Sequence, residues 1–429
     1  MKQKLKDIIT VVDIGTTKIC TIIAEKKVNE KDEFYFQVKG FGITESEGME
    51  RGSVIEMNKA TSSISKSIEI AQKSAQMNVA NIYIGIAGAH IKSSNFEGNL
   101  NLATSTKDSQ REITLEDIKL VIDDARRVAK YQPNFANLKI IHAIPHYFST
   151  DTLKGISNPL GMEASRLSAR VHIVFANETN INNIIRCFKI SGYIVNPDNV
   201  VLEPIASSYA VLNKDQRDLG AILIDIGGGT TDIAVYYHNS IRFSAVFSHG
   251  GYELTRKLSD FLKAAPGTTE ELKINFGQAI KDNIPDTEQI EVIDIAGKRT
   301  KIFKKDFAIR INDEMTILIH KIFSYLSNNI RLDQLKAGIY LTGGAANLKG
   351  LDILINQLTC MSCIICNPDL TLFKGQITPL EKPQFSTAIG IFLYVLDSEI
   401  KKGLNEISSN HQMDDFGKKV WIFIKNLFV

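Results

Sequence analysis

The hydrophobic pattern of the chain contains two segments of the same design, in which an apolar run enters a glycine turn and a second apolar run leaves it. The first spans residues 8–20 (IITVVDIGTTKIC) and the second spans residues 221–235 (AILIDIGGGTTDIAV). Apolar runs on both sides of a glycine cluster predict two β-strands joined by a tight turn. Asp13 and Asp225 hold corresponding positions 212 residues apart (225 − 13), about half of the chain. The pattern therefore predicts a duplicated fold with one hairpin in each half.

Further patterns surround the first hairpin. Residues 34–43 predict a strand, residues 58–78 carry apolar side chains at helical spacing, and residues 82–87 predict a buried strand. Strands that alternate with a helix in this way indicate a three-layer α/β unit.

Residues 88–164 break this alternation and predict a small inserted α+β unit. Its helix is expected to begin after Thr114, because Asp117 three residues later completes a short variant of the capping box. After the insert, strands at residues 170–176 and 200–202 are expected to continue the first core unit.

Two segments with small residues are expected to pack together. Residues 203–212 predict a helix that has proline near its start and small side chains on one face, and residues 386–391 open another helix of this kind. We expect these helices to meet between the two halves, although a plain helix with small residues is the alternative for the first of them.

The second half continues with a strongly periodic helix at residues 312–334. Before it, residues 246–311 hold a helix, a Pro-Gly turn and two strands around Gly297. After it, residues 339–346 predict a strand and a Gly-Gly turn, where an adenine or a ribose could lie against bare backbone.

Composition excludes several classes of protein. The net charge of +2 gives no reason to propose a nucleic acid as partner. The chain has no apolar run of 18 residues or more, so no segment is expected to span a bilayer, and no signal-peptide pattern follows Met1. Cys360, Cys363 and Cys366 form a C-x-x-C-x-x-C pattern, but they lie in an apolar strand-like run without a nearby fourth ligand. We interpret them as small buried side chains rather than as a metal site.

The glycine hairpins carry the candidate chemistry. Glycines without a Cβ atom let backbone N–H groups approach an anion closely, and Thr230 and Thr231 add hydroxyl donors. Asp225 and Asp232 could hold Mg²⁺ directly or through water. The hairpins therefore predict a site for nucleotide phosphates clamped between the two halves, with an ordinary glycine turn as the alternative.

The end of the sequence has a different pattern. Residues 398–415 are polar and predict a linker, and residues 416–429 predict a helix with one apolar face. A helix of this length cannot cross a membrane but can lie in its interface, where each lysine adds about 1 kcal/mol at an anionic surface. Docking on its own domain is the alternative. The candidate membrane residues are Phe416, Lys418, Lys419, Val420, Trp421, Phe423, Ile424, Leu427 and Phe428.

Five motifs together resemble the nucleotide-site motifs of the actin/Hsp70/sugar-kinase superfamily, in the order of that superfamily. They are DIGTTK at 13–18, EPIASSYAVL at 203–212, DIGGGTTD at 225–232, LTGGAANLKG at 341–350 and TAIGIFLY at 387–394. The inserted unit and the amphipathic tail are similar to those of the FtsA family of bacterial cell-division proteins. The resemblance covers essentially the whole chain.

The resemblance implies an α/β, actin-like two-lobed ATPase fold, made of duplicated RNase H-like domains with an FtsA-type inserted subdomain. The implied division is subdomain 1A at residues 1–87 and 165–215, 1C at 88–164, 2A at 216–245 and 312–397, and 2B at 246–311.

The resemblance also implies a set of site residues for ATP and Mg²⁺. From one side, phosphate and metal would meet Asp13, Gly15, Thr16, Thr17 and Lys18, and from the other side Gly227, Gly228, Gly229, Thr230 and Thr231. Asp225 would hold Mg²⁺ or its waters together with Asp13, and the adenosine would face Gly343, Gly344 and Ala345, with Glu270 and Lys273 as weaker candidates. Glu203 is the candidate for positioning an attacking water, and slow ATP turnover or none is expected.

The implied role is an actin-like protein that polymerises on the cytoplasmic face of the cell membrane, at the division site. Its tail would tether the tubulin-like FtsZ to the membrane, and the protein would help to recruit later divisome proteins. The acidic C-terminal peptide of FtsZ would dock on subdomain 2B, where Lys304, Lys305 and Arg310 are the candidate contacts.

Other members of the superfamily fit less well. An Hsp70 chaperone needs a large substrate-binding domain after the ATPase unit, and a sugar kinase needs a carboxylate base for which the sequence has no motif. A pilus-assembly actin homologue also carries an insert and stays as the alternative, but no amphipathic tail is expected in it.

Overall fold

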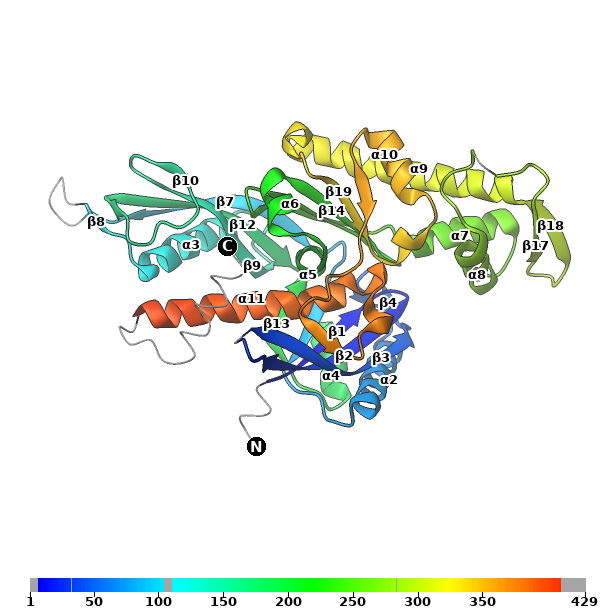
Figure 1. The fold of residues 1–429 in the computed structure, drawn as a ribbon, viewed down its shortest axis with the longest axis horizontal. Coiled ribbons are helices and arrows are strands. Elements are labelled where there is room, and N and C mark those ends of the chain that lie inside the picture. Colours follow the sequence, from blue (N-terminus) through cyan, green and yellow to red (C-terminus); the bar gives the residue numbers. More distant parts are fainter. Residues whose placement is uncertain (1–6, 32, 104–109, 283, 410–429) are drawn as a thin grey trace.

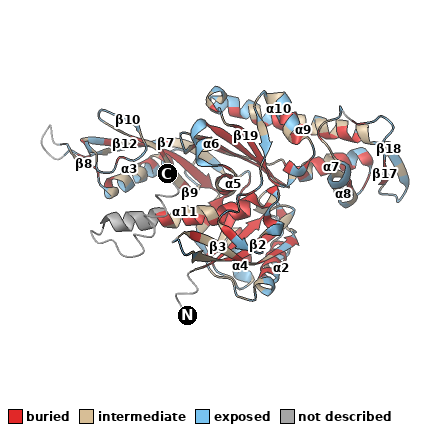
Figure 2. Cartoon of the chain, viewed as in Figure 1, coloured by how far each residue is buried: buried red, intermediate tan, exposed pale blue. Residues whose placement is uncertain are grey.

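The computed structural model describes residues 7–31, 33–103, 110–282 and 284–409 (Figure 1). Two central sheets, each covered by helices, lie one above the other in that view. A smaller sheet extends to the left, and a helix pair with the β17–β18 hairpin extends to the right. Figure 2 shows that buried residues concentrate in the central sheets and in the helices between them. The molecule therefore has two main lobes, each with an attached smaller unit.

The lower sheet in Figure 1 has the strand order β13-β6-β1-β2-β3-β21. Helices α2 (Met57–Ala75) and α4 (Glu178–Ile190) cover one face, and α5 (Glu203–Val211) and α11 (Ser386–Ser409) pack on the other. This three-layer arrangement confirms the α/β unit predicted from the sequence. The strands are β1 (Ile8–Ile14), β2 (Lys18–Val28), β3 (Phe34–Glu45), β6 (Ile82–Ile86), β13 (Val195–Leu202) and β21 (Phe373–Gly375).

The upper sheet has the strand order β16-β15-β14-β19-β20. Helices α9 (Lys304–Asn329) and α10 (Leu351–Thr359) share a core with one face, and α5 packs against the other. Helix α5 therefore lies between the two sheets. The strands are β14 (Ala221–Ile226), β15 (Thr231–Tyr237), β16 (Ser240–Phe247), β19 (Gly338–Thr342) and β20 (Cys363–Ile365).

Both predicted glycine hairpins are present and have matching environments. Strands β1 and β2 pair antiparallel with Asp13 opposite Cys20, and β14 and β15 pair antiparallel with Asp225 opposite Asp232. The first strand of each hairpin also has a parallel neighbour, β6 in one lobe and β19 in the other. The prediction of a duplicated fold is therefore confirmed.

The inserted unit is a sheet with the order β10-β9-β12-β7, covered by α3 (Leu115–Lys130). Thr114 caps α3 in a reciprocal capping box with Asp117, as predicted. The strand expected at residues 170–176 as part of the first core belongs instead to this sheet, because β12 pairs with both β7 and β9. The strands are β7 (Lys92–Asn101), β8 (Arg111–Glu112), β9 (Lys139–Thr150), β10 (Lys154–Ile156), β11 (Glu163–Ala164) and β12 (Arg166–Ala176).

The unit at the right of Figure 1 contains helices α7 (Gly251–Leu262) and α8 (Pro266–Phe276) and the hairpin of β17 (Gln289–Ile293) and β18 (Arg299–Phe303). The long helix expected at residues 312–334 starts earlier and ends earlier than predicted, since α9 runs from Lys304 to Asn329. The apolar period extends into its first turns, where Phe307, Ala308 and Ile311 are buried beside charged residues that pair across the surface.

Helix α11 also differs from the prediction. It continues to Ser409, so residues 398–409, expected to belong to a polar linker, are helical. The rest of that segment and the candidate membrane helix at 416–429 lie outside the described residues. No helix in the described part of the chain combines the length and the apolarity needed to span a bilayer.

The predicted close approach of the two small-residue helices is confirmed. Gly390 of α11 lies against the backbone of α5, where an added Cβ atom would be only 1.8 Å from the carbonyl oxygen of Ala206. Ser207 and Thr387 face each other in the same contact with 2.9 Å between their hydroxyl oxygens. The two lobes are thus joined by helices whose backbones almost touch.

The cysteine prediction is partly wrong. Cys360 is exposed, because it ends α10 in a left-handed conformation, whereas Cys363 and Cys366 are half-buried. Burial raises the pKa of their thiols to about 12 and about 11.

The remaining short elements are β4 (Met49–Glu50), β5 (Ser53–Val54), α6 (Lys214–Leu219), η1 (Leu332–Gln334), η2 (Gly344–Asn347), η3 (Thr378–Leu380) and η4 (Pro383–Phe385).

Candidate functional site

A cavity of about 610 Å³ lies where the two hairpin turns meet the α7–α8 unit and the η2 and η4 turns. A volume of this size is within the range of small-molecule and cofactor sites, roughly 300–1,000 Å³. Predicted residues that line it are Thr17, Lys18, Gly227, Gly228, Glu270, Lys273, Gly344 and Ala345. The other predicted residues of the site are not among its lining residues: Asp13, Gly15, Thr16, Glu203, Asp225, Gly229, Thr230, Thr231 and Gly343.

The two glycine turns lie directly against each other. An added Cβ atom on Gly228 would be 2.5 Å from the Thr17 methyl group, and one on Gly229 would be 2.1 Å from the Thr16 hydroxyl oxygen. Only glycine leaves room for this approach. The turns of the two lobes therefore close one end of the cavity together.

Lys18 crosses from the first lobe to the η4 turn. Its ammonium group donates to the carbonyl oxygen of Gln384 at 2.7 Å and stands 4.4 Å from the ring centre of Phe385. It also lies 3.8 Å from an oxygen of Asp13. The positive charge is thus held beside the cavity, close to a carboxylate.

Carboxyl groups from four elements gather behind the turns: Asp13 on β1, Glu203 on α5, Asp225 on β14 and Asp232 on β15. Burial raises the pKa of all four carboxyl groups. The negative charges of neighbouring carboxylates raise the pKa values of Glu203, Asp225 and Asp232 further. The pKa of Asp225 rises to about 6, even though Ser207 and Thr387 donate to its Oδ2 at 2.6 and 3.2 Å. A bound cation would offset the repulsion between these carboxylates and favour their ionised forms.

One further observation fits a magnesium ion at this cluster. Asp232 Oδ1 is buried and has no hydrogen-bond partner among the described residues, while Oδ2 accepts from Thr230. A buried oxygen without a partner commonly marks the place of a water or an ion. No three His, Cys, Asp or Glu side chains of the described chain converge as a complete metal site. Mg²⁺ does not require one, since it is usually held by one or two carboxylates, waters and phosphate oxygens.

The wall formed by α7 and α8 is fixed by Lys273. Its ammonium group pairs with Glu270 at 2.7 Å and donates to Thr255 and to the carbonyl oxygen of Gly251 at 2.8 and 3.0 Å. Burial lowers the pKa of Lys273, although Glu270 opposes this effect. Thr255 also donates to Glu270. Both predicted residues therefore line the cavity and link its α7 and α8 walls.

The Gly-Gly turn after β19 is a further part of the lining and lies beside the start of α7, since a Cβ atom on Gly251 would be 3.9 Å from that of Ala345. Gly343 has a φ of +91°, and an added Cβ atom there would be 2.3 Å from Asp225 Oδ1. Gly344 has no neighbour within 4 Å of its Cβ position, so this part of the backbone is open toward the cavity. An apolar ring could lie on it without steric conflict.

Sequence reasoning missed two parts of the lining. Gly251 and Tyr252 are held by backbone hydrogen bonds to the second turn, from Gly251 N to Gly227 O at 2.8 Å and from Tyr252 N to Gly228 O at 2.7 Å. The Gly250-Gly251 pair was a signal for this contact. The segment 381–384 also lines the cavity, but it has no motif, and only the fold brings it there.

The candidate partner residues do not lie in the cavity. Lys304 pairs with Glu288 at 2.7 Å, Lys305 with Asp286 at 2.6 Å, and Arg310 with Glu314 at 2.8 Å. All three are on the first turns of α9 and already have carboxylate partners. The candidate membrane residues lie outside the described residues.

Two lobes with corresponding hairpins, enclosing a nucleotide-sized cavity, define an actin-like fold, and comparison with solved structures agrees. A chain of the PilM–PilN type IV pilus biogenesis complex matches with a TM-score of 0.59 and 14% identity, covering 89% of this chain and 97% of that one. MreB5 of Spiroplasma citri bound to ADP matches with a TM-score of 0.54 and 13% identity, covering 93% and 99%. At these identities the matches show the fold alone.

Sequence comparison identifies the family. The chain is 32% identical to cell division protein FtsA of Neisseria meningitidis serogroup B over 389 residues, 89% of each chain. It is 29% identical to FtsA of Borreliella burgdorferi over 406 residues, 94% of each chain. Residues 222–390 match the family model "Cell division protein FtsA", and residues 88–175 match "SHS2 domain inserted in FTSA". The protein belongs to the FtsA family of cell-division proteins.

Proposed function

We propose that this protein binds ATP with Mg²⁺ in the cavity between its lobes. The observation that carries the proposal is the contact of the two glycine turns at one end of the cavity, with a buried carboxylate cluster behind them. The backbone N–H groups and threonine hydroxyls of the turns would bind the phosphates. Asp13 and Asp225 would hold Mg²⁺ or its waters, and the ion would offset the mutual repulsion of the carboxylates. The open backbone at Gly344 and Ala345 would accept the adenosine.

Glu203 would position a water for slow hydrolysis. Its carboxyl group belongs to the buried cluster, where burial and Asp232 raise its pKa. Such a group can accept a hydrogen bond from a water, but the arrangement suits a nucleotide-dependent switch better than a fast enzyme.

The proposed cellular role follows from family membership together with the sequence of the tail. The protein would polymerise on the cytoplasmic face of the membrane at the division site, anchor the FtsZ ring there and recruit later divisome proteins. Residues 416–429 would be the anchor, since their apolar and basic positions suit an interfacial helix. Several tails presented by one filament would bind far more tightly than a single tail.

The FtsZ peptide would dock on the unit at residues 246–311, within the four-subdomain division expected from the sequence. Lys304, Lys305 and Arg310 would then exchange their present carboxylate partners for those of the peptide. This exchange costs least at Lys305, because its pair with Asp286 is the most exposed of the three and exposed ion pairs contribute about 0–1 kcal/mol each.

Two experiments test the proposal. Deletion of residues 416–429 should abolish co-sedimentation with anionic vesicles while ATP binding is unchanged, and sedimentation of the truncated protein would exclude the tail as anchor.

Asp225→Ala should weaken Mg·ATP binding about tenfold or more, because the ion loses one of the two carboxylates that hold it or its waters. A factor of ten corresponds to about 1.4 kcal/mol. Unchanged affinity would exclude the metal assignment.

The pilus-assembly alternative has less support. The likeness to the PilM–PilN complex is one of fold at 14% identity, whereas the FtsA relatives match at about 30% over most of the chain. No observation on the described residues favours the pilus role.

A further inference from the structure

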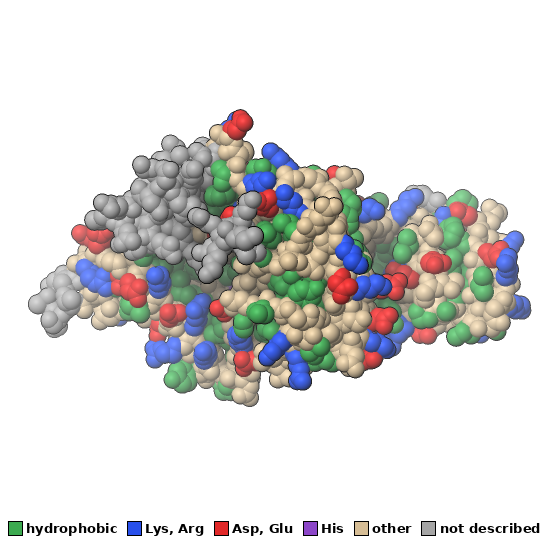
Figure 3. All heavy atoms as spheres, turned by 90° about the horizontal axis from the view of Figure 1, so that it is seen from below, with side chains coloured by type: hydrophobic (Ala, Val, Ile, Leu, Met, Phe, Trp, Pro, Cys, Tyr) green, Lys and Arg blue, Asp and Glu red, His purple; other side chains and the backbone are tan. Residues whose placement is uncertain are grey.

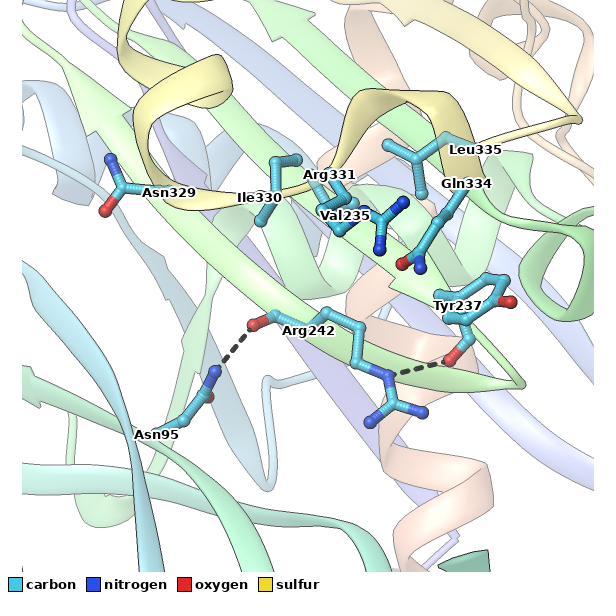
Figure 4. A pocket seen from close by; sticks show the side chains of 9 residues that line it. All are labelled: Asn95, Val235, Tyr237, Arg242, Asn329, Ile330, Arg331, Gln334 and Leu335. Atoms are coloured by element: carbon cyan, nitrogen blue, oxygen red, sulfur yellow. Dashed lines mark hydrogen bonds between the residues drawn. The ribbon is translucent and has the colours of Figure 1, made fainter.

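A second cavity, of about 370 Å³, lies between the inserted unit and the upper lobe (Figure 4) and shares no lining residue with the first. Asn95 of β7 forms one side, the β15–β16 hairpin forms the floor, and the segment that joins α9 to η1 forms the roof. Its apolar surface comes from Val235, Ile330 and Leu335. Neither the family assignment nor the proposed nucleotide site accounts for it.

The charged side chains that line this cavity are all positive. Arg242 and Arg331 are its two charged residues, and the other polar side chains are amides and the tyrosine Tyr237. Figure 4 shows Arg331 and Gln334 extending from the roof and Arg242 extending along the floor. The lining contains no carboxylate, so two positive charges border the same space.

Arg242 is held in place without an acidic partner. Its Nε–H donates to the carbonyl oxygen of Tyr237 at 3.0 Å, and its guanidinium group lies 5.7 Å from the ring centre of Tyr147. Among the described residues, no carboxylate lies within ion-pairing distance of it. Half-burial lowers the pKa of Arg242, which is the response of a cation that has lost water without gaining a counter-charge.

The wall on the insert side is also fixed. Asn95 donates through Nδ2 to the carbonyl oxygen of Arg242 at 3.0 Å, and its Oδ1 bonds His172 Nδ1 at 2.8 Å. The backbone that carries Arg242 is therefore tied to the inserted sheet. A ligand in the cavity would touch both the insert and the upper lobe.

We propose that this cavity binds an oxyanion, a carboxylate or phosphate group of a small ligand, between the guanidinium groups of Arg242 and Arg331. Guanidinium groups bind these groups through paired, charge-assisted hydrogen bonds. Arg331 is at present paired with Asp333 at 2.9 Å, but both side chains are mostly exposed, so this pair is weak enough to be exchanged. The amide of Gln334 supplies a further donor, and the apolar side chains of Val235, Ile330 and Leu335 take the body of the ligand.

Isothermal titration calorimetry of the full-length protein tests the proposal. Inorganic phosphate and succinate are titrated separately at constant ionic strength. Mg·ADP is present in excess, so that it competes with these anions for Lys18 and Lys273 in the first cavity. We expect binding of at least one of them, and Arg242→Gln and Arg331→Gln should each weaken it about tenfold, the loss of one charge-assisted contact. Arg299→Gln is the matched control, because Arg299 is equally exposed and also paired with one carboxylate, Glu291. It should leave the affinity unchanged.

The outcomes separate the sources of the ligand group. Binding of phosphate alone identifies a phosphate ligand, binding of succinate alone identifies a carboxylate ligand, and binding of both identifies a general oxyanion site. The proposal is overturned if neither binds, if both arginine variants bind as the unaltered protein does, or if Arg299→Gln weakens binding equally. Should Arg242→Gln fail to fold, the exposed Arg331 variant and its control still decide the question.

Discussion

The contact between α5 and α11 gives a prediction in which two physical effects have opposite signs. Replacing glycine by alanine inside a helix normally stabilises a protein by about 1 kcal/mol, because glycine loses more backbone entropy on folding. Gly390 lies inside α11, so helix propensity alone predicts that Gly390→Ala is more stable.

Packing predicts the reverse. The added Cβ atom would be 1.8 Å from the Ala206 carbonyl oxygen and 2.4 Å from its carbon, and both atoms belong to the backbone of α5. Restoring an ordinary contact of about 3.4 Å would require a shift of roughly 1.6 Å between two buried helices. Overpacking of a core typically costs about 1–3 kcal/mol, and a backbone obstacle that cannot change rotamer places this case at or above the upper end. We therefore expect a net loss of about 2 kcal/mol or more.

Urea unfolding monitored by circular dichroism measures the effect, with Gly267→Ala as matched control. Gly267 is also helical, in the first turn of α8, and has no atom within 4 Å of its Cβ position. The control should be as stable as the unaltered protein or slightly more so. Gly390→Ala should also weaken Mg·ATP binding, because Thr387 of the same helix donates to Asp225. A Gly390→Ala protein that matches its control in both properties would refute the close-packing argument.

Two further predictions concern buried polar groups. Ser207→Ala should weaken Mg·ATP binding about tenfold, because Asp225 loses its 2.6 Å donor, whereas Ser208→Ala should affect stability without affecting binding, since Ser208 bonds Ile205 and Tyr236 instead. Equal affinities of the two variants would contradict this assignment. Burial lowers the pKa values of three histidines in the insert, His142, His146 and His172, to about 4, 2 and 3. The unfolded imidazoles take up protons below about pH 6.5 while the folded ones stay neutral, so each histidine should cost about 1.4 kcal/mol of stability at about pH 5.5. The raised pKa of Asp225, about 6, acts in the opposite direction, because the folded state then takes up a proton that the unfolded state does not. Acidification from about pH 7.5 to 5.5 should therefore lower the free energy of unfolding in urea of the unaltered protein, relative to that of His172→Gln, by about 1.4 kcal/mol, and an equal pH response of the two proteins would contradict the histidine contribution.

The charge distribution on the surface agrees with the nearly neutral composition. Figure 3 shows basic and acidic side chains interspersed on the face seen from below. Neighbouring charges of opposite sign offset each other, and salt screens exposed charges that are more than about 8 Å apart at physiological ionic strength. Local charge imbalance is instead found at buried or half-buried groups, in the carboxylate cluster behind the turns and at Arg242 beside the second cavity.

Three parts of the sequence-based description differ from the structure. The prediction of a helix at residues 312–334 misses its first turns, although the apolar period already includes Phe307, Ala308 and Ile311, which are buried. The polar composition after residue 398 suggested a linker, but α11 continues there. The strand at 170–176 was predicted correctly as a strand, yet its pairing with β7 could not be read from its own residues.

The sequence by itself determined the features that depend on neighbours along the chain. The two hairpins, the capping box at Thr114 and the small-residue faces of two helices all follow from local turn chemistry and periodicity, and the repeated hairpin was enough to predict two lobes. The tertiary structure alone decided which distant groups meet. It brought Gln384 to Lys18, left an oxygen of Asp232 without a partner among the residues that the structure describes, and placed Arg242 and Arg331 around one cavity. Such contacts depend on how whole elements pack, and the pattern of a single segment does not contain that information.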